Sequence, residues 1–127
     1  MLRKKNNVVT GQLGERIAAE YLAGQRYEIL EKNYRKSFGE VDIIAKDQEV
    51  MVFVEVKTRQ ASAFCSAALE SVDVRKQRRL SRIARAYLLS RRLDDVPARF
   101  DVIAIVLNKK NQADTIEHIR DAFDCCG

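Results

Sequence analysis

The sequence contains few of the residues that mark several protein classes. Among its 127 residues are five glycines, one proline, three cysteines and one histidine. So little glycine and proline excludes collagen-like and low-complexity chains. No apolar run approaches the ~18 residues of a membrane-spanning helix. Residues 1–7 include a basic stretch, but the apolar stretch of a secretory signal does not follow it. We expect one soluble, cytoplasmic domain over residues 1–127, with flexible tails at 1–9 and 120–127.

Cysteine and histidine are too scarce for the usual zinc sites. No C-x-x-C pair occurs, and His118 is the only histidine, so the common ligand spacings are absent from the chain. Cys65 stands alone, whereas Cys125 and Cys126 are adjacent. An odd number of cysteines argues against a disulfide framework and fits a reducing compartment. We expect free thiols without a particular role.

Charge is plentiful but unevenly distributed. The chain has 23 basic and 18 acidic residues, a net charge of +5. Residues 72–92 contain eight of the basic residues and a single aspartate, a net charge of +7, which leaves the rest of the chain at −2. Arginine dominates this segment, and its planar guanidinium binds phosphate oxygens in pairs. A solvated helix face is the alternative, but the scarcity of acidic partners favours nucleic acid.

The same basic segment predicts a helix. Apolar residues recur at helical spacing from Leu80 to Leu88. One turn before Leu80 this stripe continues with Lys76 and Gln77, which either extend into water or point toward a polar group on the sheet. The candidates for phosphate contacts are the cations of this helix and one at the end of the preceding strand: Arg75, Lys76, Arg78, Arg79, Arg82 and Arg59.

Hydrophobic patterns elsewhere predict one more helix and five strands. The helix spans residues 10–24, where apolar residues again recur at helical spacing. Strands are expected at 27–31, 40–45, 50–58, 100–107 and 115–119, with turn-like segments at 33–39, 46–49, 94–98 and 108–113 and an irregular or partly helical segment at 59–71. The order αβββαββ predicts an α/β domain in which helices flank a mixed central sheet.

Acidic residues occupy the strand at 40–45. Successive side chains of a strand point to opposite faces of its sheet. Glu40 and Asp42 should therefore share one face, with Val41 and Ile43 on the other.

The next strand carries an acid and a lysine in the same way. Glu55 and Lys57 are two residues apart and should share a face, so the hairpin can direct Asp42 and Glu55 in a common direction. Neighbouring carboxylates repel and lose hydration near a core, whereas two carboxylates, water and a substrate phosphate form the usual Mg²⁺ site. A lysine beside such a site can orient or deprotonate the attacking water. On this motif alone a solvent-facing edge hairpin is favoured, and convergence with Glu15, Lys76 and Gln77 favours a site.

Five short motifs follow one another along the chain: Gly14-Glu15, Gly39 to Ile44, Phe53 to Arg59, Lys76 to Leu80 and Arg99 to Val102. In this combination, over about residues 7–107, the chain resembles the bacterial YraN family. Its members look like nucleases of the PD-(D/E)xK superfamily, close to archaeal Holliday junction resolvases. The resemblance implies a restriction-endonuclease-like fold, DNA ahead of RNA as the partner, and a homodimer suited to symmetric cuts.

The resemblance also implies roles for six residues around a Mg²⁺ or Mn²⁺ ion. Asp42 and Glu55 would be metal ligands, Val56 would add its backbone carbonyl, Lys57 would be the catalytic lysine, Glu15 would match a helix-borne acid, and Gln77 would match a polar residue of the following helix. Asp101 is either a further acidic site residue or, as we favour, a strand-entry aspartate that bonds a turn.

Three hypotheses for function follow. The first is a metal-dependent nuclease that hydrolyses phosphodiester bonds in DNA, with branched or junction DNA favoured. The second is a nucleic-acid-binding protein with a nuclease-like fold and no turnover. The third, a structural or interaction protein, predicts no salt-sensitive DNA binding.

Overall fold

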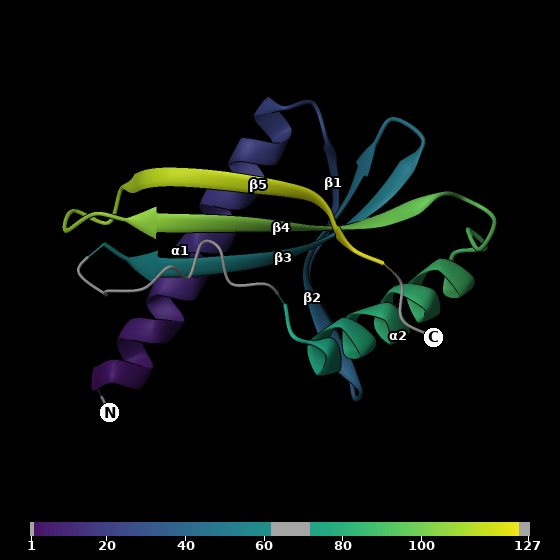
Figure 1. Cartoon of the computed structure of the whole chain (residues 1–127), viewed down its shortest axis with the longest axis horizontal. Coiled ribbons are helices and arrows are strands. Elements are labelled where there is room, and N and C mark those ends of the chain that lie inside the picture. Colours follow the sequence, from purple (N-terminus) through teal and green to yellow (C-terminus); the bar gives the residue numbers. More distant parts are fainter. Residues whose placement is uncertain (1, 62–71, 125–127) are drawn as a thin grey trace.

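The computed structural model describes residues 2–61 and 72–124 and contains two helices and five strands there (Figure 1). The elements are α1 (Leu2–Gly24), β1 (Glu28–Lys36), β2 (Gly39–Asp47), β3 (Val50–Gln60), α2 (Val74–Ser90), β4 (Ala98–Leu107) and β5 (Ala113–Phe123). The predicted order αβββαββ is confirmed, and the arrangement is consistent with a restriction-endonuclease-like fold. No helix among the described residues has the length and apolar character needed to cross a membrane.

The five strands form one sheet in the order of the sequence, so β1 and β5 are its edges. The β1–β2, β2–β3 and β4–β5 pairs are antiparallel, whereas β3 and β4 are parallel. Parallel neighbours need a long crossover connection, and α2 provides it. In Figure 1, α1 passes behind β3, β4 and β5 at a steep angle, whereas α2 lies beside β2.

Apolar side chains form two core clusters. The cluster with α1 contains Ala18, Leu22, Val52, Val54 and Ile103, and the cluster with α2 contains Phe53, Leu80, Ile83, Tyr87 and Phe100. The alternation along β3 and β4 divides their side chains between the two clusters. Each helix therefore covers one side of the central strands.

The helix α2 forms where the apolar stripe predicts it. Asp73 caps its start, because its carboxylate accepts a hydrogen bond of 2.8 Å from the Lys76 N–H. Leu80, Ile83 and Tyr87 are buried on the stripe. Most of the arginines lie on the exposed side of the helix.

A close approach fixes α1 against β3. A Cβ atom at Gly14 would overlap the side chain of Thr58, so only glycine fits there without a shift of the chain. Gly14 is buried at this contact, and Glu15 follows it on the same helix. The contact thus sets how near Glu15 lies to the strand that carries Glu55 and Lys57.

Several expected boundaries differ from the structure. The segment 33–39 was expected to be a turn, but β1 continues to Lys36 and pairs with β2 as far as Lys36–Gly39. Its polar residues belong to an edge strand and face solvent. Regular structure also extends into both expected tails, because α1 begins at Leu2 and β5 ends at Phe123. The segment 59–71, expected to be irregular or partly helical, overlaps β3, which continues to Gln60, and its residues 62–71 lie outside the described residues.

Simple alternation on β2 is wrong at one point. Ile43 packs in the cluster on the α1 side, but Val41 packs in the cluster on the α2 side, so the two do not share a face. The departure falls next to Asp42, where the pairing between β2 and β3 also ends.

Candidate functional site

The strands β2 and β3 separate at the candidate site. Their ladder runs from Asp47–Val50 to Ile43–Val54 and stops there. Beyond it, the Val56 N–H donates a hydrogen bond of 2.7 Å to Asp42 Oδ2. A side chain thus satisfies a backbone donor of β3, and the carboxyl of Asp42 is held at the opening between the strands.

The carboxyl groups of Asp42 and Glu55 lie in contact at this opening. Burial, a hydrogen bond to Glu55 and the negative charge of Glu55 together raise the pKa of Asp42 to about 9, although the Val56 N–H opposes the shift. At neutral pH the pair therefore holds a proton on Asp42 in the absence of a cation. The same cause would favour any positive charge that took the place of that proton.

Lys76 brings α2 to the carboxyl pair. Its Nζ lies 2.8 Å from Glu55 Oε2, and the side chains of Lys76 and Glu55 are 50% and 9% exposed. Burial alone would lower the pKa of Lys76, but the contact with Glu55 outweighs it and raises this pKa. Lys76 thus points toward a polar group on the sheet, as one of the two interpretations of its position in the apolar stripe predicts.

The ion pair does not satisfy Glu55 completely. Its Oε2 atom is buried and accepts no hydrogen bond of normal geometry from the described residues, despite the short distance to Lys76. Buried carboxylate oxygens are normally hydrogen-bonded. Glu55 Oε2 can therefore accept a further hydrogen bond or bind a cation at the opening.

The remaining catalytic candidates come from three different elements, α1, β3 and α2. Glu15 on α1 is half-buried, and its charge contributes to the raised pKa of Asp42. Lys57 follows Glu55 by two residues on β3 and is half-buried. Gln77 donates a hydrogen bond of 2.6 Å to the Val72 carbonyl, so this contact holds its side-chain amide near the start of α2.

The donor set suits a cation that needs only part of its ligands from protein. Among residues 2–61 and 72–124, no three Asp, Glu, His or Cys side chains come together as a metal-binding group. Asp42 and Glu55 nevertheless provide two hard oxygen ligands, and Mg²⁺ usually keeps several waters and binds through one or two carboxylates. The incompletely bonded Glu55 Oε2 and the raised pKa of Asp42 fit such an ion.

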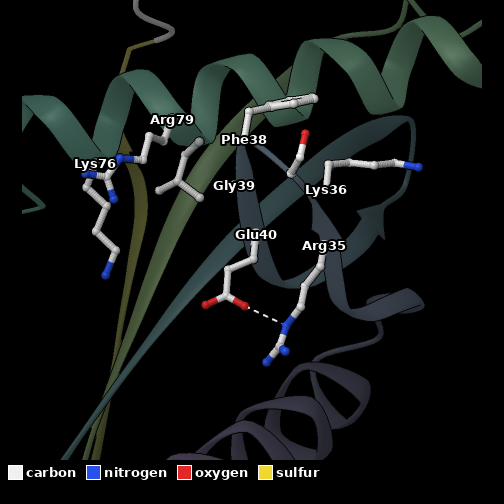
Figure 2. A pocket seen from close by; sticks show the side chains of 9 residues that line it. Arg35, Lys36, Phe38, Gly39, Glu40, Lys76 and Arg79 are labelled. Carbon is white, nitrogen blue, oxygen red and sulfur yellow. Dashed lines mark ion pairs between the residues drawn. The ribbon is translucent and has the colours of Figure 1, made fainter.

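A basic groove lies beside the carboxyl pair, between α2 and the β1–β2 hairpin (Figure 2). Its cavity volume is about 770 Å³. The nine lining residues are Arg35, Lys36, Ser37, Phe38, Gly39, Glu40, Lys76, Arg79 and Leu80. Four of them are cations, and the single acid, Glu40, forms an ion pair of 2.8 Å with Arg35. The groove forms where α2 packs against this hairpin.

The predicted phosphate-binding residues divide into two groups. Lys76 and Arg79 line the groove, and the guanidinium of Arg82 lies 5.1 Å from the centre of the Phe38 ring at its wall. Arg75 and Arg78 are exposed on α2 outside the groove lining. Arg59 is exposed near the end of β3, where its side chain donates to the Thr58 carbonyl.

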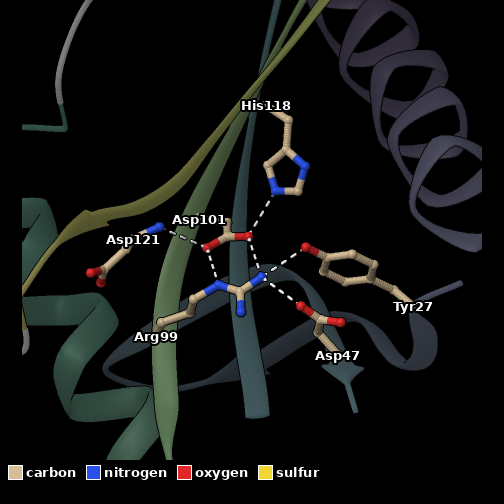
Figure 3. Close-up of polar contacts among 6 residues, drawn as sticks. All are labelled: Tyr27, Asp47, Arg99, Asp101, His118 and Asp121. Atoms are coloured by element: carbon tan, nitrogen blue, oxygen red, sulfur yellow. Dashed lines mark hydrogen bonds and ion pairs between the residues drawn. The ribbon is translucent and has the colours of Figure 1, made fainter. Parts of the chain in front are cut away.

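A second polar cluster lies on the α1 side of the sheet (Figure 3). Asp101, which is 1% exposed, accepts hydrogen bonds from Arg99 and from the Asp121 N–H, and its Oδ2 lies 2.7 Å from His118 Nε2. Arg99 also contacts Asp47. The sequence offered two roles for Asp101, a further acidic site residue or a strand-entry aspartate that bonds a turn, and the structure shows neither. Asp101 instead links β4 to β5 and, through Arg99, to the end of β2.

Known proteins resemble this chain over most of its length. The family model described as "Uncharacterised protein family UPF0102" matches residues 14–105. A UPF0102 protein of Geotalea uraniireducens (strain Rf4) is 48% identical over 121 residues, covering 95% of this chain and 94% of that protein. One from Trichlorobacter lovleyi is 49% identical, covering 94% of each chain, and one from Dictyoglomus turgidum is 40% identical, covering 93% of this chain and 99% of that protein. The chain therefore belongs to the UPF0102 family, known also as YraN.

Proposed function

We propose that this protein is a metal-dependent nuclease of the PD-(D/E)xK type that hydrolyses phosphodiester bonds in DNA, with branched or junction DNA as its substrate. The observation that carries the proposal is the contact between Asp42 and Glu55 at the opening between β2 and β3. Two carboxyl groups in contact repel when both are charged, and a bound cation would remove this repulsion.

The surroundings of the pair support the proposal. The backbone of Val56 meets Asp42, and Lys57 follows on the same strand. Cations from α2 and the β1–β2 hairpin line a groove next to the pair. An acid pair beside a basic groove suits hydrolysis of a phosphodiester, because the acids can bind a cation and the groove can bind the substrate anion.

The residues of the chain divide the work as follows. Asp42, Glu55 and the Val56 carbonyl would hold Mg²⁺ or Mn²⁺, which when bound polarises a phosphoryl oxygen and makes water more acidic. Lys57 would hold the attacking water and accept or share its proton. Arg79 and the other exposed arginines of α2 would position the DNA strand by binding its phosphates.

A cleavage assay with four DNA substrates tests the proposal. Junction, flap, duplex and single-stranded DNA are incubated with Mg²⁺ or Mn²⁺, with wild type, Asp42→Asn and Lys57→Ala in parallel. We expect cleavage by the wild type only, with junction or flap preferred, and DNA affinities of the variants close to that of the wild type. Undiminished cleavage by both variants would rule out the proposed site.

The second candidate is a non-catalytic nucleic-acid-binding protein with the same fold. The groove and the arginines of α2 favour it without any need for turnover. It predicts salt-sensitive DNA binding by the wild type together with intact DNA in all four reactions. Calorimetric titration with Mg²⁺ separates the two candidates further, because a catalytic site should bind the ion and lose it in Glu55→Gln.

A further inference from the structure

We infer that Lys76 is an exchangeable counter-ion, which holds Glu55 in the free protein and moves to a nucleic-acid phosphate when the groove is filled. This role rests on the proposed function and adds a property to it. Metal and nucleic acid would then bind with positive coupling through a single side chain. A lysine that only lined the groove would contribute to nucleic-acid affinity alone.

The first step of the argument is the position of Lys76 between two sites. Among the described residues it is the one that both lines the groove and forms the ion pair with Glu55. Figure 2 shows Lys76 and Arg79 on α2 at the side of the groove opposite Arg35. A small rotation of a long lysine side chain is enough to exchange partners, because its four-carbon stem is flexible.

The second step is the weakness of its hold on Glu55. The Lys76 side chain is 50% exposed, and Glu55 Oε2 gains no hydrogen bond of normal geometry from it. Because half of the side chain meets solvent, the ammonium of Lys76 can turn from Glu55 toward another anion. Glu55, in contrast, is buried and needs a positive partner. Lys76 is thus free to move, whereas the buried carboxylate of Glu55 needs a positive charge beside it at all times.

The third step follows from charge. A divalent cation on Asp42 and Glu55 would lie beside the Lys76 ammonium, and the like charges would repel. A phosphate in the groove offers Lys76 another partner and lowers this cost. By linkage, nucleic acid then raises metal affinity by the same factor as metal raises nucleic-acid affinity.

Mg²⁺ binding measured by calorimetry tests the inference, with and without a saturating DNA duplex. All proteins carry Lys57→Ala so that the duplex stays intact. In the absence of DNA we expect Lys76→Met to raise Mg²⁺ affinity roughly tenfold. We expect DNA to raise Mg²⁺ affinity strongly with Lys76 present and much less with methionine at that position.

Arg79→Met is the matched control. It removes one positive charge from the same helix and the same groove, and no ion pair joins Arg79 to Glu55 among the described contacts. It should weaken DNA binding and leave Mg²⁺ affinity without DNA close to that of the reference protein. Equal Mg²⁺ affinities in the Lys76 and Arg79 variants would overturn the inference.

Thermal unfolding provides a readout that is independent of DNA. Lys76→Met should lower Tm in EDTA, because it leaves Glu55 uncompensated, and Mg²⁺ should restore most of the loss. The same substitution in a Glu55→Gln background should lower Tm little, and an equal loss of Tm in both backgrounds would contradict the exchange.

The outcomes distinguish the two proposals. Absence of Mg²⁺ binding in every protein overturns the proposed function as well. Normal cleavage by the wild type, together with equal Mg²⁺ affinities of the Lys76 and Arg79 variants, overturns the role of Lys76 alone.

Discussion

Two aspartates of this protein have pKa values moved in opposite directions. Burial and the neighbouring carboxyl of Glu55 raise the pKa of Asp42 to about 9. Burial alone would also raise the pKa of Asp101, but hydrogen bonds from His118 and Arg99 outweigh it and lower this pKa. One carboxyl therefore lies next to another acid and forms no ion pair among the described contacts, while the other is bonded to Arg99 and His118. This difference separates a group available for binding from a group used for structure.

The stability of the metal-free protein should fall as pH rises because of Asp42. Its native pKa of about 9 lies above the value of ~3.9 in an unfolded chain, so the native state keeps a proton that the unfolded state releases. The resulting stabilisation is complete below about pH 4 and is lost as the pH approaches 9. In urea unfolding from pH 5 to 9, Asp42→Asn should show a weaker decline than wild type, and parallel declines would contradict the assignment.

Sequence patterns indicated candidate residues for the site but not the contacts between them. The spacing of Glu55 and Lys57 on one strand predicted a shared face, and the polar continuation of the apolar stripe signalled Lys76. The contact of Asp42 with the Val56 N–H could not be predicted, because alternation fails between Val41 and Ile43 where the strands separate. Partners distant in sequence leave no periodic signal.

At the scale of elements, the Asp101 cluster joins the β4–β5 hairpin to the end of β2, which is distant from it in sequence. It includes Arg99 on β4, His118 on β5, and Asp47 at the end of β2. This cluster could not be predicted from the sequence, because residues with such separations share no local pattern. A lone aspartate in an apolar run was the available signal.

Asp101→Asn should destabilise the fold strongly. Removal of one partner from a buried charged pair typically costs about 3–5 kcal/mol, because the other charge is left without compensation. Denaturant unfolding at pH 7 measures the change in free energy. Asp114→Asn, on the exposed side of β5, removes the same charge and should change stability by less than about 0.5 kcal/mol. Similar losses in the two variants would contradict the role of the cluster.

The packing of α1 on β3 predicts opposite effects of alanine at two glycines of one helix. Gly14→Ala should cost about 1–3 kcal/mol of unfolding free energy, because the new Cβ overlaps Thr58. Gly11→Ala meets no atom within 4 Å and should stabilise the helix by about 0.4–1 kcal/mol. Thr58→Ala should recover part of the Gly14→Ala loss in a double variant. Equal effects at both glycines would show that α1 does not approach β3 so closely.

The whole molecule separates its charges in space as well as in sequence. The net charge of +7 on residues 72–92 is carried mainly on the exposed side of α2, while the rest of the chain is at −2. The order of elements was predictable because each is long and regular. The basic groove was not, since it arises only where α2 packs against the β1–β2 hairpin.

Nucleic-acid binding should depend on salt through α2. Each phosphate contact releases counter-ions, so Arg75→Gln or Arg79→Gln should each reduce the slope of log Kd against log salt by roughly one. Lys109→Gln removes the same charge from the β4–β5 connection, at the end of the sheet away from α2 in Figure 1, and should leave the slope unchanged. Fluorescence anisotropy with a labelled duplex at several salt concentrations measures the slopes. Equal reductions in all three variants would contradict a specific role for α2.

The edges of the sheet limit how two copies of this protein can meet. Both β1 and β5 carry charged, exposed side chains, and β1 has a register shift between Ile29 and Glu31 as well as a left-handed residue at Asn33. Charges and bulges of this kind discourage the backbone of an edge strand from pairing with another chain. A dimer of this protein would therefore have to join through side chains on its helices or loops, without continuing the sheet from one copy into the next.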